Sequence, residues 1–126
     1  MEKKYLIDTN VIIDFTGNRL TGAPKTFVGD IIDNQPYISV IKKIELLGFS
    51  VVPVEIIEFT DSSQVVGLNE EIVDLTIAIR KRAKIKLPDA IIASTCILLG
   101  LTLITRNEDD FGKIEGLSLL NPWTLA

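Results

Sequence analysis

Residues 90–105 read AIIASTCILLGLTLIT, and no charged side chain interrupts them. This run of 16 residues is shorter than the roughly 18–20 apolar residues that a membrane-spanning helix needs. Gly100 divides the run, as glycine often does where a helix ends. Pro88 fits the first position of a helix. The stretch therefore predicts a buried helix over Asp89–Leu99, followed by a buried strand over Leu101–Thr105.

Outward from this run, short apolar segments alternate with helix signals along the chain. We expect strands at Tyr5–Ile7, Tyr37–Ser39, Gln64–Gly67, Leu101–Thr105 and Ser118–Leu120. A helix capped by Thr9 or Asn10 is expected to run to Phe15, and another is expected from the Asn69 cap to about Lys84. Further helices are expected at Phe27–Ile32, Val40–Leu47, Pro53–Glu58 and Asp89–Leu99. Strands that are apolar throughout are typical of parallel sheets covered on both faces. The sequence thus predicts an α/β protein, a three-layer α/β/α sandwich with a central, mainly parallel sheet.

Length and composition indicate one globular domain over residues 1–126. The chain has 126 residues, of which 47% are apolar and 24% charged, a composition typical of folded proteins. Met1, Glu2, Lys3 and Lys4 lead into only three apolar residues before Asp8, which is too few for a secretion signal. We therefore expect a cytoplasmic protein that does not enter a membrane.

Histidine is absent, and Cys96 is the single cysteine. These two facts exclude histidine-based nucleophile pairs, histidine metal ligands, an internal disulfide and a thiolate zinc site. The formal net charge of −4 disfavours nucleic acid as a bulk partner. If four carboxylates bind metal, however, the remaining 13 acidic residues balance the 13 basic ones. A phosphate-rich substrate is therefore not excluded.

Several acidic residues stand in unusually apolar surroundings. Asp8 follows the first strand, Glu45 lies within Ile44-Glu45-Leu46-Leu47, and Asp89 lies between Pro88 and Ala90. Burying an isolated carboxylate is costly, so a compensating partner is expected. A hard divalent cation such as Mg²⁺ prefers oxygen ligands and would supply that partner. Such a cation can activate water for attack on a phosphodiester.

Helix capping is the alternative explanation for some of these carboxylates. Asp8 and Asp89 lie near expected helix starts, where a carboxylate stabilises free amides by about 0.5–2 kcal/mol. Capping also explains Asp109 and Asp110, which precede Phe111. Glu45 lies in mid-helix, where capping does not apply, and its alternative is solvent exposure or an ion pair with Lys42.

Four sequence blocks, taken in order, resemble PIN-domain ribonucleases and specifically the VapC-type toxins of toxin–antitoxin pairs. The blocks are Leu6–Asp14 (LIDTNVIID), Ile38–Leu46 (ISVIKKIEL), Ile85–Ala93 (IKLPDAIIA) and Leu103–Asn107 (LITRN) followed by Asp110-Phe111. The third block is the most diagnostic, and the four together span the chain from about Tyr5 to Leu120.

The resemblance implies a single PIN-like α/β/α domain that cleaves RNA with Mg²⁺ or Mn²⁺. It implies Asp8, Glu45, Asp89 and Asp110 as catalytic and metal-binding acids, with Asp109 as the alternative fourth acid. It places four further residues around the pocket, namely Thr9, Asn10, Thr105 and Asn107. It also implies an RNA substrate, an antitoxin partner and a homodimer.

Basic residues near these acids are candidate RNA contacts. They are Lys42, Arg82, Lys84, Lys86 and Arg106. For Arg82, Lys84 and Lys86 the alternative is that they only form a solvated, positively charged surface at the end of a helix. Lys42 departs from the family pattern, which often has a small hydroxyl residue there. Because Lys42 precedes Glu45 by three residues, the two share one helix side. Its ammonium would either compete with a cation or bind a substrate phosphate.

Two other function classes remain as alternatives. One is a catalytically weakened PIN-like module that binds RNA or a protein partner without cleavage, and Lys42 is the feature that favours it. The other is a phosphatase of the haloacid dehalogenase type, which needs a second acid two residues after Asp8. Position 10 is Asn10, so this second class is disfavoured.

Overall fold

The computed structural model describes residues 3–125 of the chain. Met1, Glu2 and Ala126, which belong to the expected 1–126 domain, lie outside the described residues. Five strands form one sheet, and all of its pairings are parallel. In the order β3-β2-β1-β4-β5 across the sheet, the strands span Gln64–Val66, Tyr37–Ser39, Tyr5–Ile7, Thr102–Ile104 and Ser118–Leu120.

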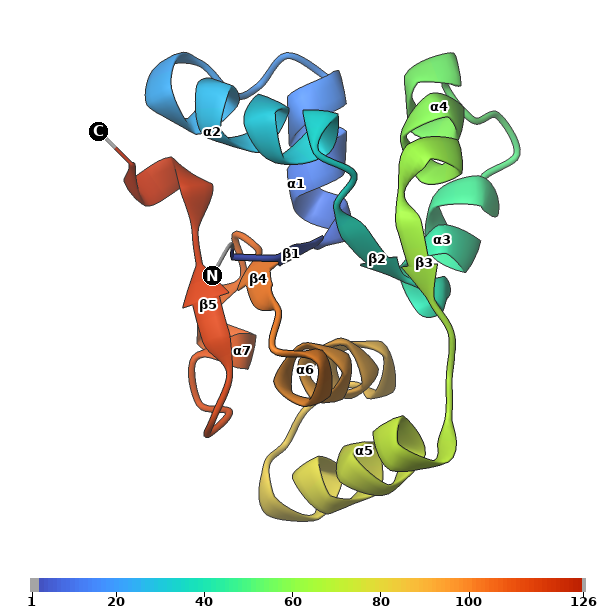
Figure 1. The fold of residues 1–126 in the computed structure, drawn as a ribbon, viewed down its shortest axis with the longest axis vertical. Coiled ribbons are helices and arrows are strands. Elements are labelled where there is room, and N and C mark those ends of the chain that lie inside the picture. Colours follow the sequence, from blue (N-terminus) through green and yellow to red (C-terminus); the bar gives the residue numbers. More distant parts are fainter. Residues whose placement is uncertain (1–2, 126) are drawn as a thin grey trace.

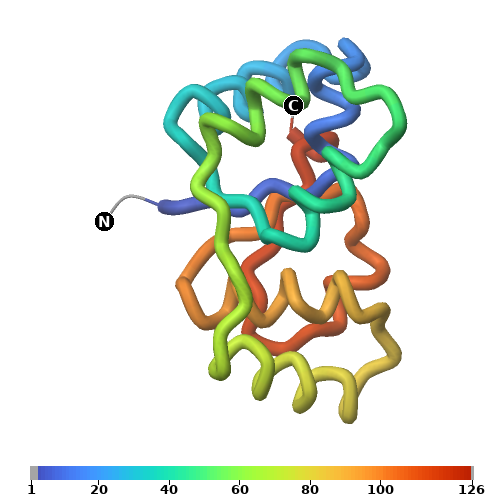
Figure 2. Tube along the Cα trace, turned by 90° about the vertical axis from the view of Figure 1, so that its right-hand side faces the viewer, coloured from blue at the N-terminus to red at the C-terminus, as the bar shows by residue number. Residues whose placement is uncertain are grey.

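Helices cover both faces of the sheet, as Figures 1 and 2 show from two perpendicular directions. One layer contains α1 (Thr9–Thr16), α2 (Gly22–Asp33), α3 (Val40–Leu47) and α4 (Val54–Ser62), and the opposite side carries α5 (Glu70–Arg82) and α6 (Leu87–Leu99). The short α7 (Glu108–Phe111) follows β4, and a 3₁₀ helix (Pro122–Thr124) follows β5. The expected three-layer α/β/α sandwich is confirmed.

The two central strands divide their side chains between two hydrophobic cores. Leu6 and Leu103 pack among residues of α5 and α6, whereas Ile7 and Ile104 pack among residues of α1, α2 and α4. Neighbouring side chains of a strand point to opposite faces, so a sheet between two cores must be apolar at every position. This explains why β1 and β4 read as continuous apolar runs in the sequence.

Helix signals in the sequence were accurate where capping residues were strong. Asn69 accepts a hydrogen bond from the backbone N–H of Ile72, and Gly100 ends α6 with a positive φ of 67°. The helices α2 and α4 are longer than expected, because both continue beyond their apolar centres at Phe27–Ile32 and Pro53–Glu58. No helix within residues 3–125 is long and apolar enough to cross a membrane.

Candidate active site

The carboxyl ends of the central strands bring the expected acids together. Asp8 follows β1, and Glu45 lies on α3, which begins directly after β2. Asp89 lies in the first turn of α6, and Asp110 lies on α7 just beyond β4. Ligand sites of open parallel sheets form at this end of the strands. The site therefore draws on four separate parts of the chain.

Asp8 is 4% exposed and is held from several sides. It is the N-cap of α1, and its Oδ1 accepts a hydrogen bond from the Thr9 backbone N–H at 2.8 Å. Its Oδ2 accepts from the Thr105 hydroxyl at 2.8 Å and from Asn10 Nδ2 at 3.4 Å. The expectation that Thr9 or Asn10 caps this helix is wrong, because Asp8 is the last residue with extended backbone before the helix. The capping alternative for Asp8 is therefore confirmed.

The ammonium of Lys42 lies among three of the acids. Lys42 Nζ is 3.3 Å from Glu45 Oε2, 3.7 Å from Asp8 Oδ1 and 4.0 Å from Asp89 Oδ1. The Lys42 side chain is 10% exposed, whereas that of Glu45 is 42% exposed. Both sequence alternatives for Glu45 therefore hold at once, since it is solvent-facing and paired with Lys42. The Lys42 ammonium thus lies where the carboxylates of Asp8, Glu45 and Asp89 meet.

Asp89 does not cap its helix. The N-cap of α6 is Lys86, which makes no side-chain capping bond. Burial raises the pKa of Asp89, Lys42 lowers it, and the nearby charges of Asp8 and Asp110 raise it further. This carboxyl therefore lies in a cluster of like charges. An added cation would relieve that repulsion.

Asp110 joins the cluster through Asn107. Asn107 Nδ2 donates to Asp110 Oδ2 at 2.8 Å, and the Asn107 backbone N–H donates to the Thr105 hydroxyl at 3.1 Å. The Thr105 hydroxyl in turn donates to Asp8. Asp109 is exposed, and it is Asp110 whose charge acts on Asp89. The geometry therefore favours Asp110 over Asp109 as the fourth acid.

The donor set suits a hard divalent cation. Asp8, Glu45 and Asp89 offer carboxylate oxygens around one ammonium, which is itself a cation standing between them. The Thr9 hydroxyl beside Asp8 is buried and has no hydrogen-bond partner within the described chain. Across residues 3–125, no three acidic side chains are already spaced as ligands of one metal ion. The oxygen ligands are of the type that a divalent cation binds, but the Lys42 ammonium lies between them.

A second buried carboxylate, Asp14, was not singled out from the sequence. Asp14 is 2% exposed, and it pairs with Arg106 Nη1 at 2.9 Å and Arg19 Nη1 at 3.4 Å. The Arg106 guanidinium also lies 5.5 Å from the ring centre of Trp123. The apolar neighbours of Asp14 in Val11-Ile12-Ile13-Asp14-Phe15 were the signal that could have revealed it.

The candidate RNA contacts differ in their distance from the acids. Lys42 lies within the cluster, and exposed Lys86 is close enough to lower the pKa of Asp89. The backbone N–H of Arg106 donates to Asn10 Oδ1 at 3.3 Å, which places Arg106 beside the pocket. Arg82 and Lys84 are exposed and form no ion pair within the described range 3–125. The structure thus joins three of the five to the site.

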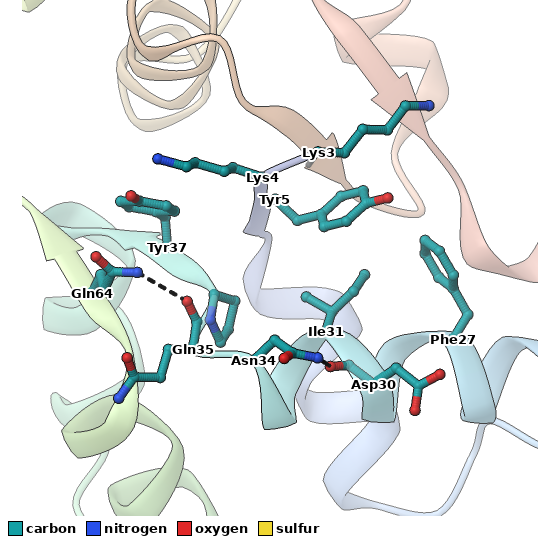
Figure 3. Close-up of a pocket in the computed structure, with 11 residues that line it drawn as sticks. Lys3, Lys4, Tyr5, Phe27, Asp30, Ile31, Asn34, Gln35, Tyr37 and Gln64 are labelled. Atoms are coloured by element: carbon teal, nitrogen blue, oxygen red, sulfur yellow. Dashed lines mark hydrogen bonds between the residues drawn. The ribbon is translucent and has the colours of Figure 1, made fainter. Parts of the chain in front are cut away.

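A cavity of about 790 Å³ lies at the other end of the sheet. Figure 3 shows it between the amino ends of β1, β2 and β3, where Tyr5, Tyr37 and Gln64 begin these strands. Gln64 Nε2 donates there to the Gln35 carbonyl at 3.1 Å. None of the four expected acids lines this cavity. It is therefore separate from the candidate active site.

Solved structures with similar folds include toxin–antitoxin complexes. A toxin–antitoxin complex from Klebsiella pneumoniae is 28% identical with a TM-score of 0.72, and the match covers 97% of this chain and 100% of that one. VapBC-1 from nontypeable Haemophilus influenzae is 26% identical with a TM-score of 0.76, covering 95% and 98% of the two chains. DNA-bound VapBC from Salmonella typhimurium is 20% identical with a TM-score of 0.77, covering 96% and 99%, and shows the fold alone.

Sequence comparison identifies the family directly. No curated protein sequence matches this chain. The family model of the PIN domain matches residues 5–117, a range that contains β1 to α7 and all four acids. PIN domains are nucleases, so this match supports a hydrolase. The chain belongs to the PIN-domain family.

Proposed function

We propose that this protein is an endoribonuclease that hydrolyses RNA phosphodiester bonds with Mg²⁺ or Mn²⁺ and acts as the toxin of a toxin–antitoxin pair. The observation that carries the proposal is the convergence of Asp8, Glu45 and Asp89 on one cationic centre. Asp110 adds a fourth negative charge. Such a set of oxygen ligands is what a hard metal ion requires.

In this proposal Asp8, Glu45, Asp89 and Asp110 hold the cation. A bound Mg²⁺ or Mn²⁺ would supply the positive charge needed to activate a water molecule for attack on the phosphorus and to stabilise the charge that develops on the phosphate. Thr105 and the Thr9 backbone N–H fix both oxygens of Asp8. Asn107 orients Asp110 in the same way. The chain thus orients Asp8 and Asp110 within a negatively charged cradle formed by the four acids.

Positive side chains near this cradle would bind the RNA backbone. Lys86 lies close to Asp89, and Arg106 lies beside Asn10. The more distant Arg82 and Lys84 would extend the path of the strand. Lys and Arg contacts to phosphates supply most of the sequence-independent affinity for nucleic acid. In this proposal the bound metal neutralises part of the acidic charge, so the net charge of −4 does not prevent RNA binding.

The partner in this proposal is an antitoxin protein. The support comes from the relatives, since the Klebsiella pneumoniae structure is described as a toxin–antitoxin complex. Exposed apolar side chains on and between α3 and α4 support contact with another protein, namely Ile44, Phe49, Val51, Val54 and Ile57. A homodimer and a cytoplasmic location belong to the same proposal, and buried Cys96 suits a reducing compartment.

A cleavage assay with purified protein tests the proposal. Labelled structured RNA is incubated with Mn²⁺, with Mg²⁺ and with EDTA, and wild type is compared with Asp8→Asn. We expect cleavage by wild type with either metal, and none with EDTA or with the variant. Equal cleavage in EDTA would contradict the metal requirement, and a fully active Asp8→Asn would contradict the site.

The second candidate is a PIN-like module that binds RNA or a protein partner without cutting. The position of Lys42 Nζ among three carboxylates favours it, because an ammonium there replaces part of the charge of a metal. RNA binding measured in EDTA separates the two candidates. Binding without cleavage under every metal condition would favour the module.

A further inference from the structure

A helix cap directs Lys42 into the acid cluster. Ser39 ends β2 and caps α3, and its hydroxyl accepts a hydrogen bond from the Ile41 backbone N–H at 3.2 Å. Lys42 follows in the first turn of α3, with its side chain only 10% exposed. The Lys42 ammonium is therefore largely buried, and it is paired with carboxylates rather than surrounded by solvent.

The charges around Lys42 do not balance. Asp8, Glu45 and Asp89 place three negative charges against the single ammonium of Lys42, and Asp110 adds a fourth beside Asp89. Exposed Lys86 adds a further, more screened attraction on Asp89. Even with Lys86 counted, negative charge remains in excess. The cluster thus retains attraction for a divalent cation while Lys42 is present.

A metal ion and the Lys42 ammonium nevertheless need the same oxygens. Lys42 Nζ contacts Asp8 Oδ1, Asp89 Oδ1 and both oxygens of Glu45, the last two at 3.4 and 3.3 Å. Two positive charges held against one set of oxygens would repel each other strongly in so buried a place. The two cations therefore exclude each other from the centre of the cluster.

We propose that Lys42 is an internal competitor for the divalent cation, so that the cation binds only by displacing the Lys42 ammonium from Asp8 and Asp89. This inference rests on the metal site of the proposed function and adds a control over its loading. The lysine side chain is long and flexible, so its head can move without any change of fold.

The competition has two measurable consequences. Removing the ammonium should tighten binding of the metal, since part of the binding free energy no longer goes into displacing Lys42. Removing it should also destabilise the metal-free protein, because the buried carboxylate of Asp8 then loses its cation. Saturating metal should restore that loss. A side chain that merely fills space would produce neither effect.

The test is calorimetric titration of the full-length protein with Mn²⁺ alone, together with melting temperatures in EDTA and in saturating Mn²⁺. The variants are Lys42→Met, which keeps the apolar stem, and Lys42→Gln, which keeps a hydrogen-bond donor should the first fold poorly. Lys42→Arg keeps the charge and should behave like wild type. Lys43→Met on the same helix is the matched control for a lost positive charge.

We expect Lys42→Met to bind Mn²⁺ about tenfold more tightly than wild type, within the usual range of coupling between two sites. Its melting temperature should fall in EDTA and recover with Mn²⁺. Lys43→Met should show neither change. Equal or weaker Mn²⁺ binding by both Lys42→Met and Lys42→Gln would overturn the inference.

The same titration separates this inference from the proposed nuclease. If wild type cuts RNA with Mn²⁺ but the Lys42 variants bind the ion no more tightly, only the competition is refuted. If wild type neither binds Mn²⁺ nor cuts RNA while Lys42→Met binds the ion, the competition stands and the nuclease proposal fails for the natural chain. If no variant binds Mn²⁺, both proposals fall.

Discussion

Two buried aspartates stand at opposite ends of α1, and their surroundings differ in charge. Asp14 forms ion pairs with two guanidinium groups, those of Arg19 and Arg106. Asp8 shares one ammonium, that of Lys42, with Asp89 and Glu45. Positive charge is therefore in excess at Asp14, whereas negative charge is in excess at Asp8.

This difference separates Asp14, whose negative charge is neutralised by arginines of the chain, from Asp8, whose negative charge is neutralised only in part. The contacts of Asp14 tie α1 to Arg106 just after β4, and Arg106 lies over Trp123 of the C-terminal 3₁₀ helix. Those contacts explain burial without any ligand. The carboxylates around Asp8 remain short of positive charge, and buried clusters of like charge concentrate at functional sites. Burial alone therefore does not distinguish the two aspartates, but charge balance does.

The largest expected effect is on cleavage by Asp8→Asn. Asparagine caps helices about as well as aspartate, but it offers one neutral oxygen where the metal needs a carboxylate. We expect RNA cleavage to fall by at least about 100-fold, since even outer partners of metal ligands are worth 10- to 100-fold. Initial rates with Mn²⁺ measure this. The melting temperature in EDTA should not fall, and a clear fall would show that the carboxylate charge of Asp8 mainly stabilises the fold.

The opposite pattern is expected for Asp14→Asn. Its partners are largely exposed, with side chains 55% and 71% accessible for Arg106 and Arg19, so solvent screens part of the loss. We expect the free energy of unfolding to drop by about 1–2 kcal/mol. Urea denaturation measures it. The affinity for Mn²⁺ should stay at the wild-type level, and a weakened affinity would show that the two aspartates form one site.

A smaller effect concerns the pH dependence of stability through Asp89. Its pKa is raised in the folded protein above the ordinary value of 3.8, mainly by burial. The folded state therefore holds the proton more strongly than the unfolded state. Between 3.8 and the raised pKa, metal-free stability should increase as the pH falls, and above that window the full penalty of the ionised carboxylate remains.

Asp89→Asn isolates this contribution. In EDTA at neutral pH the variant should be more stable than wild type, and the difference should shrink as the pH falls towards 3.8. Thermal unfolding across a pH series is the measurement. A difference that is constant with pH would mean that ionisation of Asp89 does not set the stability of the cluster.

The smallest expected effect is on RNA binding by Arg106→Gln. Arg106 already gives one contact to Asp14, so only part of its charge is available to a phosphate. We expect a loss of affinity of a few-fold and a shallower dependence on salt, by about 0.7 for one contact to a single strand. Fluorescence anisotropy in EDTA measures both quantities. Lys25→Gln, at an exposed position of α2, is the matched control, and equal losses in both variants would remove Arg106 from the interface.

Most of the fold was predictable from the sequence because local signals agreed with the tertiary structure. Apolar runs at Tyr5–Ile7 and Leu101–Thr105 predicted buried parallel strands, and β1 and β4 lie there. Strong stops at Gly48 and Gly100 gave the ends of α3 and α6. The start of α2 was harder, because the glycine and proline of Gly22-Ala23-Pro24 serve equally in loops and first helical turns. The start of α4 at Pro53 was predicted, but the helix continues past Glu58 to Ser62.

The sequence by itself determined which residues are acidic, which of them stand in apolar surroundings, and that no histidine ligand and no thiolate zinc site are available. It could not determine that Lys42 lies between Asp8 and Asp89, since these residues are far apart along the chain and meet only when α3 and α6 pack on the sheet. Nor could it reveal that Asp14 is neutralised from both sides. Charge balance depends on distances between elements, and only the tertiary structure decides those distances.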